Sequence, residues 1–477
     1  MKTPRPACRG RKTRLILLAS IAVGAVPAVA DVRLPKFFGD NMVLQREQPV
    51  RVWGWADVGE AVSVALSGTT VATKADDKGQ WALELPAVKV GANLELTVQG
   101  NNTVTLRNVL VGDIWVCSGQ SNMAMALKPC LGAADDIKAA DLPEIRHIKV
   151  RNVKSGQPEL DTPTATPWQV CSPETAPGFT AVGFYFAREI HHRTGVPIGI
   201  IDTNWGGTKI EPWTVGEEPA APDAKPDKNG LYNAMIHPLV KLPVKGALWY
   251  QGEANGSEGE TYYEKMRALI SGWRKQWGLG DFPFYYVQLA NYQAPTADPA
   301  GGNGWAKLRE AQLKALTIPN TGMAVVIDTV PLAQSANIHP VNKCDVGLRL
   351  ARWALNRDYG QKDLEVSGPL FKALMIEGGK ARVEFDHAGS GLMLGKKEGR
   401  GEVVETKGEK LNRIAIAGAD KRWFWADAVL DHNTLVVSSP EVKEPVAVRY
   451  AFEMNPDAAN LYNREGLPAS PFRSDAW

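Results

Sequence analysis

The sequence predicts an α/β protein of three domains, in which a parallel sheet with helices on both faces lies between two β-sandwiches. Three observations predict this class. The 477 residues correspond to about three domains of about 150 residues each. Continuous apolar strands alternate with helical segments in the middle of the chain, which is typical of a parallel sheet. Short runs of alternating polar and apolar residues lie on either side, which is typical of antiparallel sandwiches.

Residues 1–30 have the pattern of a secretory signal peptide, which is removed on export. Six lysine and arginine residues begin the segment, an apolar run follows at 15–23, and the small residues at 28–30 precede Asp31. The apolar run is too short and too interrupted to span a bilayer. We therefore expect the mature chain to begin near Asp31, to have no membrane span, and to be periplasmic or secreted.

The charge of the mature chain argues against a nucleic-acid partner. The whole chain has 54 basic and 52 acidic residues, and the leader contains six of the basic ones and no acid, so residues 31–477 carry 48 basic and 52 acidic side chains. A slightly acidic chain lacks the basic surface that binds phosphate backbones. The composition, 44% hydrophobic and 22% charged, is that of a folded globular protein.

The cysteines give no sign of a metal site. Beyond the leader they are Cys117, Cys130, Cys171 and Cys344. None has the Cys/His spacing of a metal-binding motif, and we expect neither a metal nor another cofactor. Four cysteines in an exported chain permit one or two disulfides, although a chain of this size does not need them.

The two outer domains, residues 31–108 and 360–477, are predicted as sandwiches because their strands have period two. The first contains strands at 50–53, 62–66, 81–85 and 94–98, and the second at 371–376, 381–385, 412–417, 434–438 and 447–452. Turn sequences separate the strands. The tail from Asn455 is rich in proline, asparagine and serine, and we expect a loosely packed strap over the surface.

The central domain, residues 109–359, is predicted to contain a parallel sheet. Its apolar strands are 114–116, 197–201, 246–250, 284–287 and 323–327, and its helices are 182–194, 263–277, 305–316 and 341–357. In the second helix, apolar residues recur every three or four positions, which places them on one face against a sheet. Strands that alternate with helices in this way form a parallel sheet covered on both sides.

Polar residues follow the ends of these strands, where ligands bind in folds of this type. Ser121 follows the first strand on a turn preceded by glycine, beside backbone N–H groups that can stabilise an anion. Gly206-Gly207 follows the second, where glycine lets N–H groups approach a substrate oxygen. Gln251 and Glu253 follow the third, and His339 lies in a loop after the fifth. The strand ends thus supply a nucleophile, donors and a base.

In this order, the motifs resemble those of the SGNH hydrolase superfamily and, within it, the sialate O-acetylesterase family and related carbohydrate acetylesterases. The motifs are Gly119-Gln120-Ser121-Asn122-Met123, which is the most specific, and the segments 40–46, 52–55, 205–208, 249–253 and 338–340. The resemblance covers about residues 33–355 and implies a flavodoxin-like SGNH hydrolase core. Many family members carry an extra β domain where this chain has a short connector at 215–229.

The resemblance implies a metal-independent serine esterase that removes O-acetyl groups from carbohydrate. Carried over motif by motif, Ser121 is the nucleophile, and His339 is the base that takes its proton and later protonates the leaving sugar hydroxyl. The backbone N–H groups of Ser121 and Gly206 and the side-chain amide of Gln251 form the oxyanion hole.

One position departs from the superfamily pattern. Many SGNH enzymes have an aspartate three residues before the histidine, and here Ala336 occupies that position. Three groups remain open as the partner that orients His339. Glu253 is favoured because related acetylesterases use this glutamate, a backbone carbonyl near Ser335 is second, and Asp328 at the end of the fifth strand is third.

The resemblance leaves the acetylated sugar open. O-acetylated sialic acid and acetylated hemicellulose, such as xylan or xyloglucan, both fit. A non-catalytic carbohydrate-binding protein is the alternative from a different class, favoured by the missing acid and by the 15 tryptophans, whose rings suit sugar surfaces. The intact Ser121 and His339 argue against that alternative.

Overall fold

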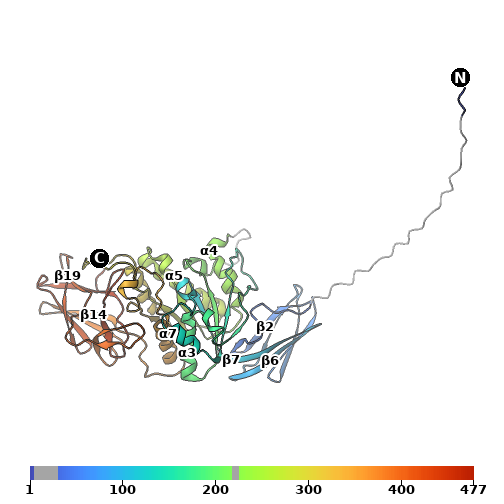
Figure 1. Ribbon diagram of the computed structural model, residues 1–477, viewed down its shortest axis with the longest axis horizontal. Coiled ribbons are helices and arrows are strands. Elements are labelled where there is room, and N and C mark those ends of the chain that lie inside the picture. The colour runs from blue at the N-terminus through green and yellow to red at the C-terminus, as the bar shows by residue number, and fades with distance from the viewer. Residues whose placement is uncertain (5–30, 217–224) are drawn as a thin grey trace.

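The computed structural model describes residues 1–4, 31–216 and 225–477 (Figure 1). The fold is mixed α/β, with a central, mostly parallel sheet and additional β-sheets on either side of it along the long axis of the molecule (Figure 1). Apart from residues 1–4, the predicted signal peptide lies outside the described residues, as does the middle of the predicted connector at 215–229.

The N-terminal region, blue in Figure 1, consists of strands alone. They are β1 (Val43–Gln45), β2 (Val50–Trp55), β3 (Ala61–Leu66), β4 (Thr69–Lys74), β5 (Gln80–Leu85) and β6 (Gly91–Gln99). Strands β2 and β5 form one antiparallel pair, while β4, β3, β6, β7 and β1 are hydrogen-bonded in a second sheet. The alternating burial along β3 and β5 is the period-two pattern of a strand with one face in a core.

Strand β7 (Thr103–Gly119) joins this region to the central sheet. Its first part pairs with β6, and its last part pairs with β10 and β11. The boundary expected between residues 108 and 109 therefore falls inside one continuous strand of 17 residues. Strand β7 therefore belongs to both sheets.

The central sheet has the order β13-β12-β11-β7-β10-β8-β9. Its further strands are β8 (Leu142–Lys149), β9 (Gln169–Cys171), β10 (Ile198–Asn204), β11 (Gly246–Tyr250), β12 (Phe284–Val287) and β13 (Thr321–Ala324). All neighbours are parallel except β8 and β9. The five strands expected from the sequence overlap β7, β10, β11, β12 and β13, whereas β8 and β9 are additional edge strands.

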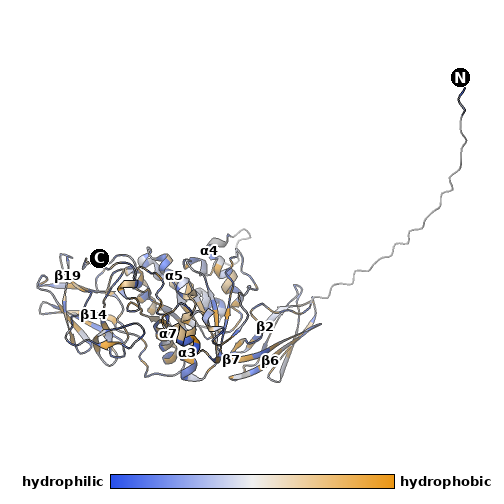
Figure 2. Ribbon diagram, in the orientation of Figure 1, coloured by the Kyte–Doolittle hydropathy of each residue, from blue (hydrophilic) through white to orange (hydrophobic). Residues whose placement is uncertain are grey.

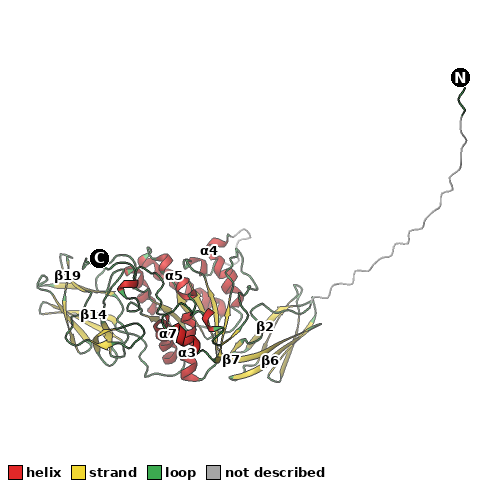
Figure 3. Ribbon diagram, viewed as in Figure 1, coloured by secondary structure: helices red, strands yellow, loops and turns green. Residues whose placement is uncertain are grey.

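Helices cover both faces of this sheet (Figure 3). They are α1 (Ser121–Ala124), α2 (Ala133–Lys138), α3 (Ala181–Thr194), α4 (Pro226–Leu231), α5 (Tyr262–Trp277), α6 (Ala306–Lys314) and α7 (Lys343–Arg357). Trp115 on β7 packs on Phe186 of α3, with ring centroids 4.8 Å apart, and Trp249 on β11 packs on Trp273 of α5 at 6.0 Å. Trp115 is paired in register with Gly246, so Trp249, three residues later, points to the opposite face. Helix α3 packs with α7, and α5 with α6.

The C-terminal region, orange to red in Figure 1, contains three antiparallel sheets. Its strands are β14 (Leu370–Glu377), β15 (Lys380–Asp386), β16 (Leu392–Lys396), β17 (Val404–Glu405), β18 (Ile414–Gly418), β19 (Trp423–Trp425), β20 (Asp427–Asp431), β21 (Thr434–Ser438), β22 (Pro445–Tyr450), β23 (Leu461–Asn463) and β24 (Phe472–Arg473). The sheets have the orders β14-β15-β21-β20, β17-β16-β23 and β19-β18-β22-β24. Burial alternates along β15 and β21, whereas β18 is buried throughout, and hydrophobic and hydrophilic segments are mixed in this region (Figure 2).

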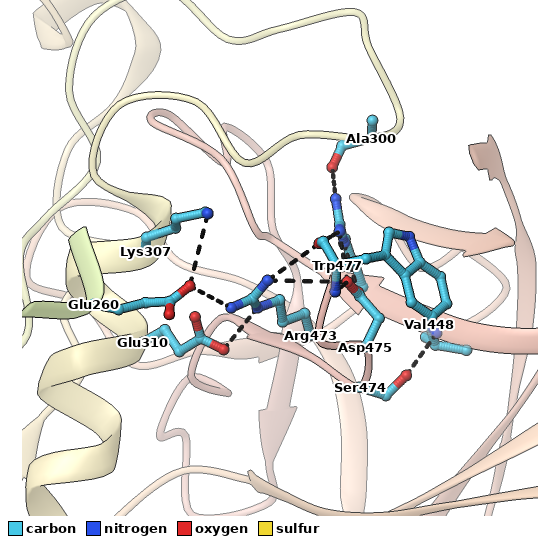
Figure 4. Close-up of polar contacts among 10 residues, drawn as sticks. Glu260, Ala300, Lys307, Glu310, Val448, Arg473, Ser474, Asp475 and Trp477 are labelled. Atoms are coloured by element: carbon cyan, nitrogen blue, oxygen red, sulfur yellow. Dashed lines mark hydrogen bonds and ion pairs between the residues drawn. The ribbon is translucent and has the colours of Figure 1, made fainter. Parts of the chain in front are cut away.

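The tail from Asn455 is not the loose strap that its composition predicts. Strands β23 and β24 pair within two of the sheets. Arg473 reaches the central region, where it pairs with Glu260 at 2.7 Å and Glu310 at 2.8 Å, and Asp475 pairs with Arg449 at 2.7 Å (Figure 4). The prediction was wrong because these tail residues have partners that are distant in sequence, so the tail fastens the C-terminal sheets to α6.

The four cysteines of the described residues form no disulfide. Cys117, Cys130, Cys171 and Cys344 are buried free thiols. Burial raises the pKa of Cys171 to about 12 and that of Cys130 to about 11, so these thiols stay protonated at neutral pH.

Within residues 31–216 and 225–477, no helix is long and apolar enough to cross a membrane.

Candidate active site

The turn after β7 exposes Ser121 at the carboxyl edge of the central sheet. Gly119 has φ +133°, and a Cβ there would lie 2.2 Å from the carbonyl oxygen of Tyr250 on the neighbouring strand. Only glycine fits that position. The N–H of Gln120 donates to the same carbonyl at 3.0 Å. Ser121 follows as the first residue of α1, and its side chain faces the loop that carries His339.

His339 lies between β13 and α7, and its Nε2 is 2.8 Å from Ser121 Oγ. Partial burial lowers the pKa of His339, and the nearby Lys343 ammonium lowers it further. The imidazole is therefore neutral at neutral pH and can accept the serine proton. Among the described residues, its Nδ1 has no hydrogen-bond partner.

Gly206 lies directly beside Ser121. A Cβ at position 206 would be 3.3 Å from Ser121 Cβ, so a larger residue would press on the nucleophile. In the part of the chain that the structure describes, the backbone N–H groups of Ser121 and Gly206 have no acceptor. Both are available to an oxygen that approaches Ser121.

Gln251 does not have the geometry expected of an oxyanion donor. Its side chain is fully buried, and Nε2 donates to Asn255 Oδ1 at 2.7 Å and to Gln120 Oε1 and Thr208 O at 3.1 Å each. Tyr262 donates to Gln251 Oε1 at 2.6 Å, which fixes the orientation of the amide. Because these oxygens engage both amide hydrogens, Gln251 holds Gln120, the residue before the nucleophile.

Glu253 lies near the histidine loop but contacts a different residue from the one expected. Its Oε1 accepts from Asn122 Nδ2 at 2.5 Å, and its buried Oε2 has no partner among the described residues. Burial raises the pKa of this carboxyl. No hydrogen bond joins Glu253 to His339 in residues 31–216 and 225–477.

The other two groups expected to orient His339 have partners elsewhere. Asp328 forms a two-pronged ion pair with Arg349, with oxygen–nitrogen distances of 2.6 and 2.7 Å. The carbonyl of Ser335 accepts from the N–H of Gln293 at 2.7 Å. Among the described residues, the carboxylate of Asp328 is bound to this guanidinium and no hydrogen bond joins it to His339.

Two residues without an assigned role in the sequence analysis complete the site. Asn122 Nδ2 donates to the carbonyl of Ile338 at 3.0 Å, and Lys343 Nζ donates to the carbonyl of Pro340 at 2.7 Å. Lys343 Nζ also donates to Asn122 Oδ1 at 2.6 Å. Asn122 belongs to the serine motif, which is a signal that could have found it. Lys343 is a single lysine at the start of a helix, and no local pattern distinguishes it.

A serine hydroxyl hydrogen-bonded to a neutral histidine at the carboxyl edge of a parallel sheet is the arrangement of a hydrolase with a serine nucleophile. No group of three or more His, Cys, Asp or Glu residues in the described ranges could hold a metal ion.

Comparison with known proteins identifies the family. The family model described as "Carbohydrate esterase, sialic acid-specific acetylesterase" matches residues 111–356. The chain belongs to this family, and it is therefore a carboxylic ester hydrolase. This confirms the resemblance drawn from the sequence motifs.

The relatives cover nearly the whole chain. The chain is similar to mouse sialate O-acetylesterase, with 29% identity over 96% of this chain and 97% of that protein. The human sialate O-acetylesterase has 29% identity over 92% of both chains. The crystal structure of a carbohydrate acetylesterase from Xanthomonas citri has 41% identity and a TM-score of 0.85, and the match covers 94% of this chain and 100% of that one.

Proposed function

We propose that this protein is an exported carbohydrate O-acetylesterase in which Ser121 and His339 carry the reaction. The observation that carries the proposal is the distance of 2.8 Å between Ser121 Oγ and His339 Nε2. It is supported by the lowered pKa of His339, which keeps the base neutral, and by the backbone N–H groups of Ser121 and Gly206, which have no acceptor among the described residues.

The reaction follows from these positions. Ser121 Oγ attacks the acetyl carbonyl while His339 Nε2 takes the hydroxyl proton, and the N–H groups of Ser121 and Gly206 bind the developing oxyanion. The bond to the sugar oxygen breaks, and His339 returns the proton to that oxygen, which leaves an acetyl ester on Ser121. Water then attacks the acetyl ester with His339 as base, and acetate and free Ser121 result.

The order of the central strands supports the finer fold assignment. Numbered along the chain without the edge pair β8 and β9, strands β7, β10, β11, β12 and β13 have the spatial order 2-1-3-4-5, which is that of a flavodoxin-like sheet. We include in the proposal an SGNH hydrolase core at residues 109–359, sandwich domains at 31–108 and 360–477, and a cleaved signal peptide at 1–30.

The favoured substrate is O-acetylated sialic acid, because the mammalian relatives are named sialate O-acetylesterases. Acetylated hemicellulose, such as xylan or xyloglucan, is the alternative. It is consistent with the broader name, carbohydrate acetylesterase, of the Xanthomonas citri protein, whose sequence is more similar to this chain.

Acetate release by the purified mature protein tests the proposal. O-acetylated sialic acid and acetylated xylo-oligosaccharide are compared side by side, with Ser121→Ala as the inactive variant. Ser118→Ala is the matched control, because the buried hydroxyl of Ser118 on β7 has no partner among the described residues. We expect release with the wild type and the Ser118 variant, and essentially none with Ser121→Ala.

Two results would contradict the proposal. Release that persists in Ser121→Ala would remove the nucleophile assignment. No release from either substrate, with sugar binding retained, would favour a carbohydrate-binding protein.

A further inference from the structure

The carbonyl groups of Ile338 and Pro340, the two residues that flank His339, are both held by buried side chains. Asn122 Nδ2 donates to the carbonyl of Ile338 at 3.0 Å, and Lys343 Nζ donates to the carbonyl of Pro340 at 2.7 Å. The side chain of Asn122 is 1% exposed and that of Lys343 is fully buried. The backbone of His339 is therefore clamped on both sides, while its Nδ1 has no partner among the described residues.

Asn122 and Lys343 also form one unit. Lys343 Nζ donates to Asn122 Oδ1 at 2.6 Å, which turns the amide nitrogen of Asn122 toward Glu253 and Ile338. Asn122 directly follows Ser121 in the chain. The segment that carries the nucleophile and the segment that carries the base are thus cross-linked through this network and not through the imidazole alone.

Stability does not account for Lys343. Burial of an ammonium group costs free energy, and a direct ion pair would offset part of that cost. The groups facing Lys343 are Glu253, which the Asn122 amide separates from it, Cys130, the ring of Tyr250 at 5.3 Å, and His339. Burial accordingly lowers the pKa of Lys343 to about 7. Buried groups whose pKa is shifted this far cluster at functional sites.

We propose that Asn122 and Lys343 are positioning residues that hold His339 in line with Ser121 through the two flanking carbonyls, in place of a carboxylate on the imidazole. This proposal rests on the esterase function proposed above. Glu253 then acts through Asn122 and not on His339 directly. Neither Asn122 nor Lys343 needs to touch the substrate, so their loss affects kcat and leaves KM nearly unchanged.

Lys343→Met tests the positioning role, because methionine fills the space without the charge or the donors. We expect kcat to fall about 10- to 100-fold, since a shift of about 1 Å in a reacting group can cost about 100-fold. The ammonium lowers the pKa of His339, so its removal should move the acidic limb of the kcat/KM profile to higher pH. That shift reports the charge of Lys343, whereas a fall in kcat with KM unchanged reports its positioning of His339.

Asn122→Ala, alone and together with Lys343→Met, tests whether the two residues act as a unit. Residues in one network have non-additive effects, so the double variant should be no more than about threefold slower than the slower single variant. Lys397→Met is the matched control, because this lysine is 5% exposed and paired with Asp345 at 3.0 Å. This variant loses a buried ammonium that does not contact the loop of His339, and its kcat should match that of the wild type.

The outcomes separate this proposal from the proposed function. If Ser121→Ala abolishes acetate release while Lys343→Met and Asn122→Ala keep kcat within twofold of the wild type, the positioning role of Asn122 and Lys343 is wrong. The proposed esterase function is then still supported. The positioning proposal would also be overturned if the fold-loss of kcat in the double variant equalled the product of the losses in the two single variants. If Lys343→Met does not fold, kcat and KM of Asn122→Ala decide the question by the same criterion.

Discussion

Two carboxylates that follow strands of the parallel sheet, Glu253 after β11 and Asp328 after β13, have opposite surroundings. Asp328 is 3% exposed and meets Arg349 directly through two short hydrogen bonds. Glu253 meets only the neutral amide of Asn122, and the nearest cation, Lys343, lies on the other side of that amide. Both carboxylates were candidates to orient His339, and no hydrogen bond from either reaches it within the described residues.

The difference shows that the distance between a buried carboxyl group and a buried basic group affects their pKa values. Burial alone would lower the pKa of Arg349, but direct contact with Asp328 outweighs it and raises that pKa, so the guanidinium stays ionised. With an amide between them, burial raises the pKa of Glu253 and lowers that of Lys343 to about 7, so both are shifted toward their neutral forms. Asp328 and Arg349 bind each other. In contrast, Asn122 and Lys343 also donate hydrogen bonds to the loop that carries His339.

The largest effect is expected from breaking the direct pair. Asp328→Asn leaves the buried Arg349 guanidinium without its counter-charge, and loss of one partner of a buried ion pair costs about 3–5 kcal/mol. Urea denaturation should show this loss in the free energy of unfolding, with kcat of the folded enzyme unchanged. A stable variant with a large loss of kcat would instead return Asp328 to the histidine.

Replacement of Glu253 is expected to have a smaller effect, which falls on kcat and not on the free energy of unfolding. Glu253→Gln keeps an acceptor for Asn122 and removes a buried ionisable group, so the free energy of unfolding should stay within about 1 kcal/mol of the wild type. We expect kcat to fall about tenfold, because the carboxylate acts on His339 only through Asn122. Steady-state acetate release measures this, and a loss near 10⁴-fold, as for a direct triad acid, would contradict the bridged arrangement.

The smallest effect is a displacement of the pH profile. His339 must be neutral to accept the serine proton, so kcat/KM falls as pH drops through the pKa of His339 in the free enzyme. Burial and Lys343 lower that pKa, so the acidic limb of the wild type should lie below about 6.5, the ordinary value for histidine. Asp328→Asn should leave the limb in place. A wild-type limb at or above the ordinary value would contradict the described surroundings of His339.

Local patterns predicted most of the fold. Five strands of the central sheet and its four longer helices lie where continuous apolar runs and helical periodicity place them, because both signals are properties of neighbouring residues. The edge strands β8 and β9 were missed, and the tail was misjudged, because composition does not report partners such as Glu260 and Glu310 for Arg473.

The candidate site divides in the same way. A serine, a pair of glycines and a histidine could be placed after strand ends from the sequence, and they were expected to lie together because the carboxyl ends of parallel strands meet at one edge. The contacts of Gln251 with Gln120, and of Asn122 with Lys343, 221 positions away, became visible only in the folded structure. Side chains that distant in sequence leave no local periodicity, and their hydrogen bonds exist only once the chain has folded.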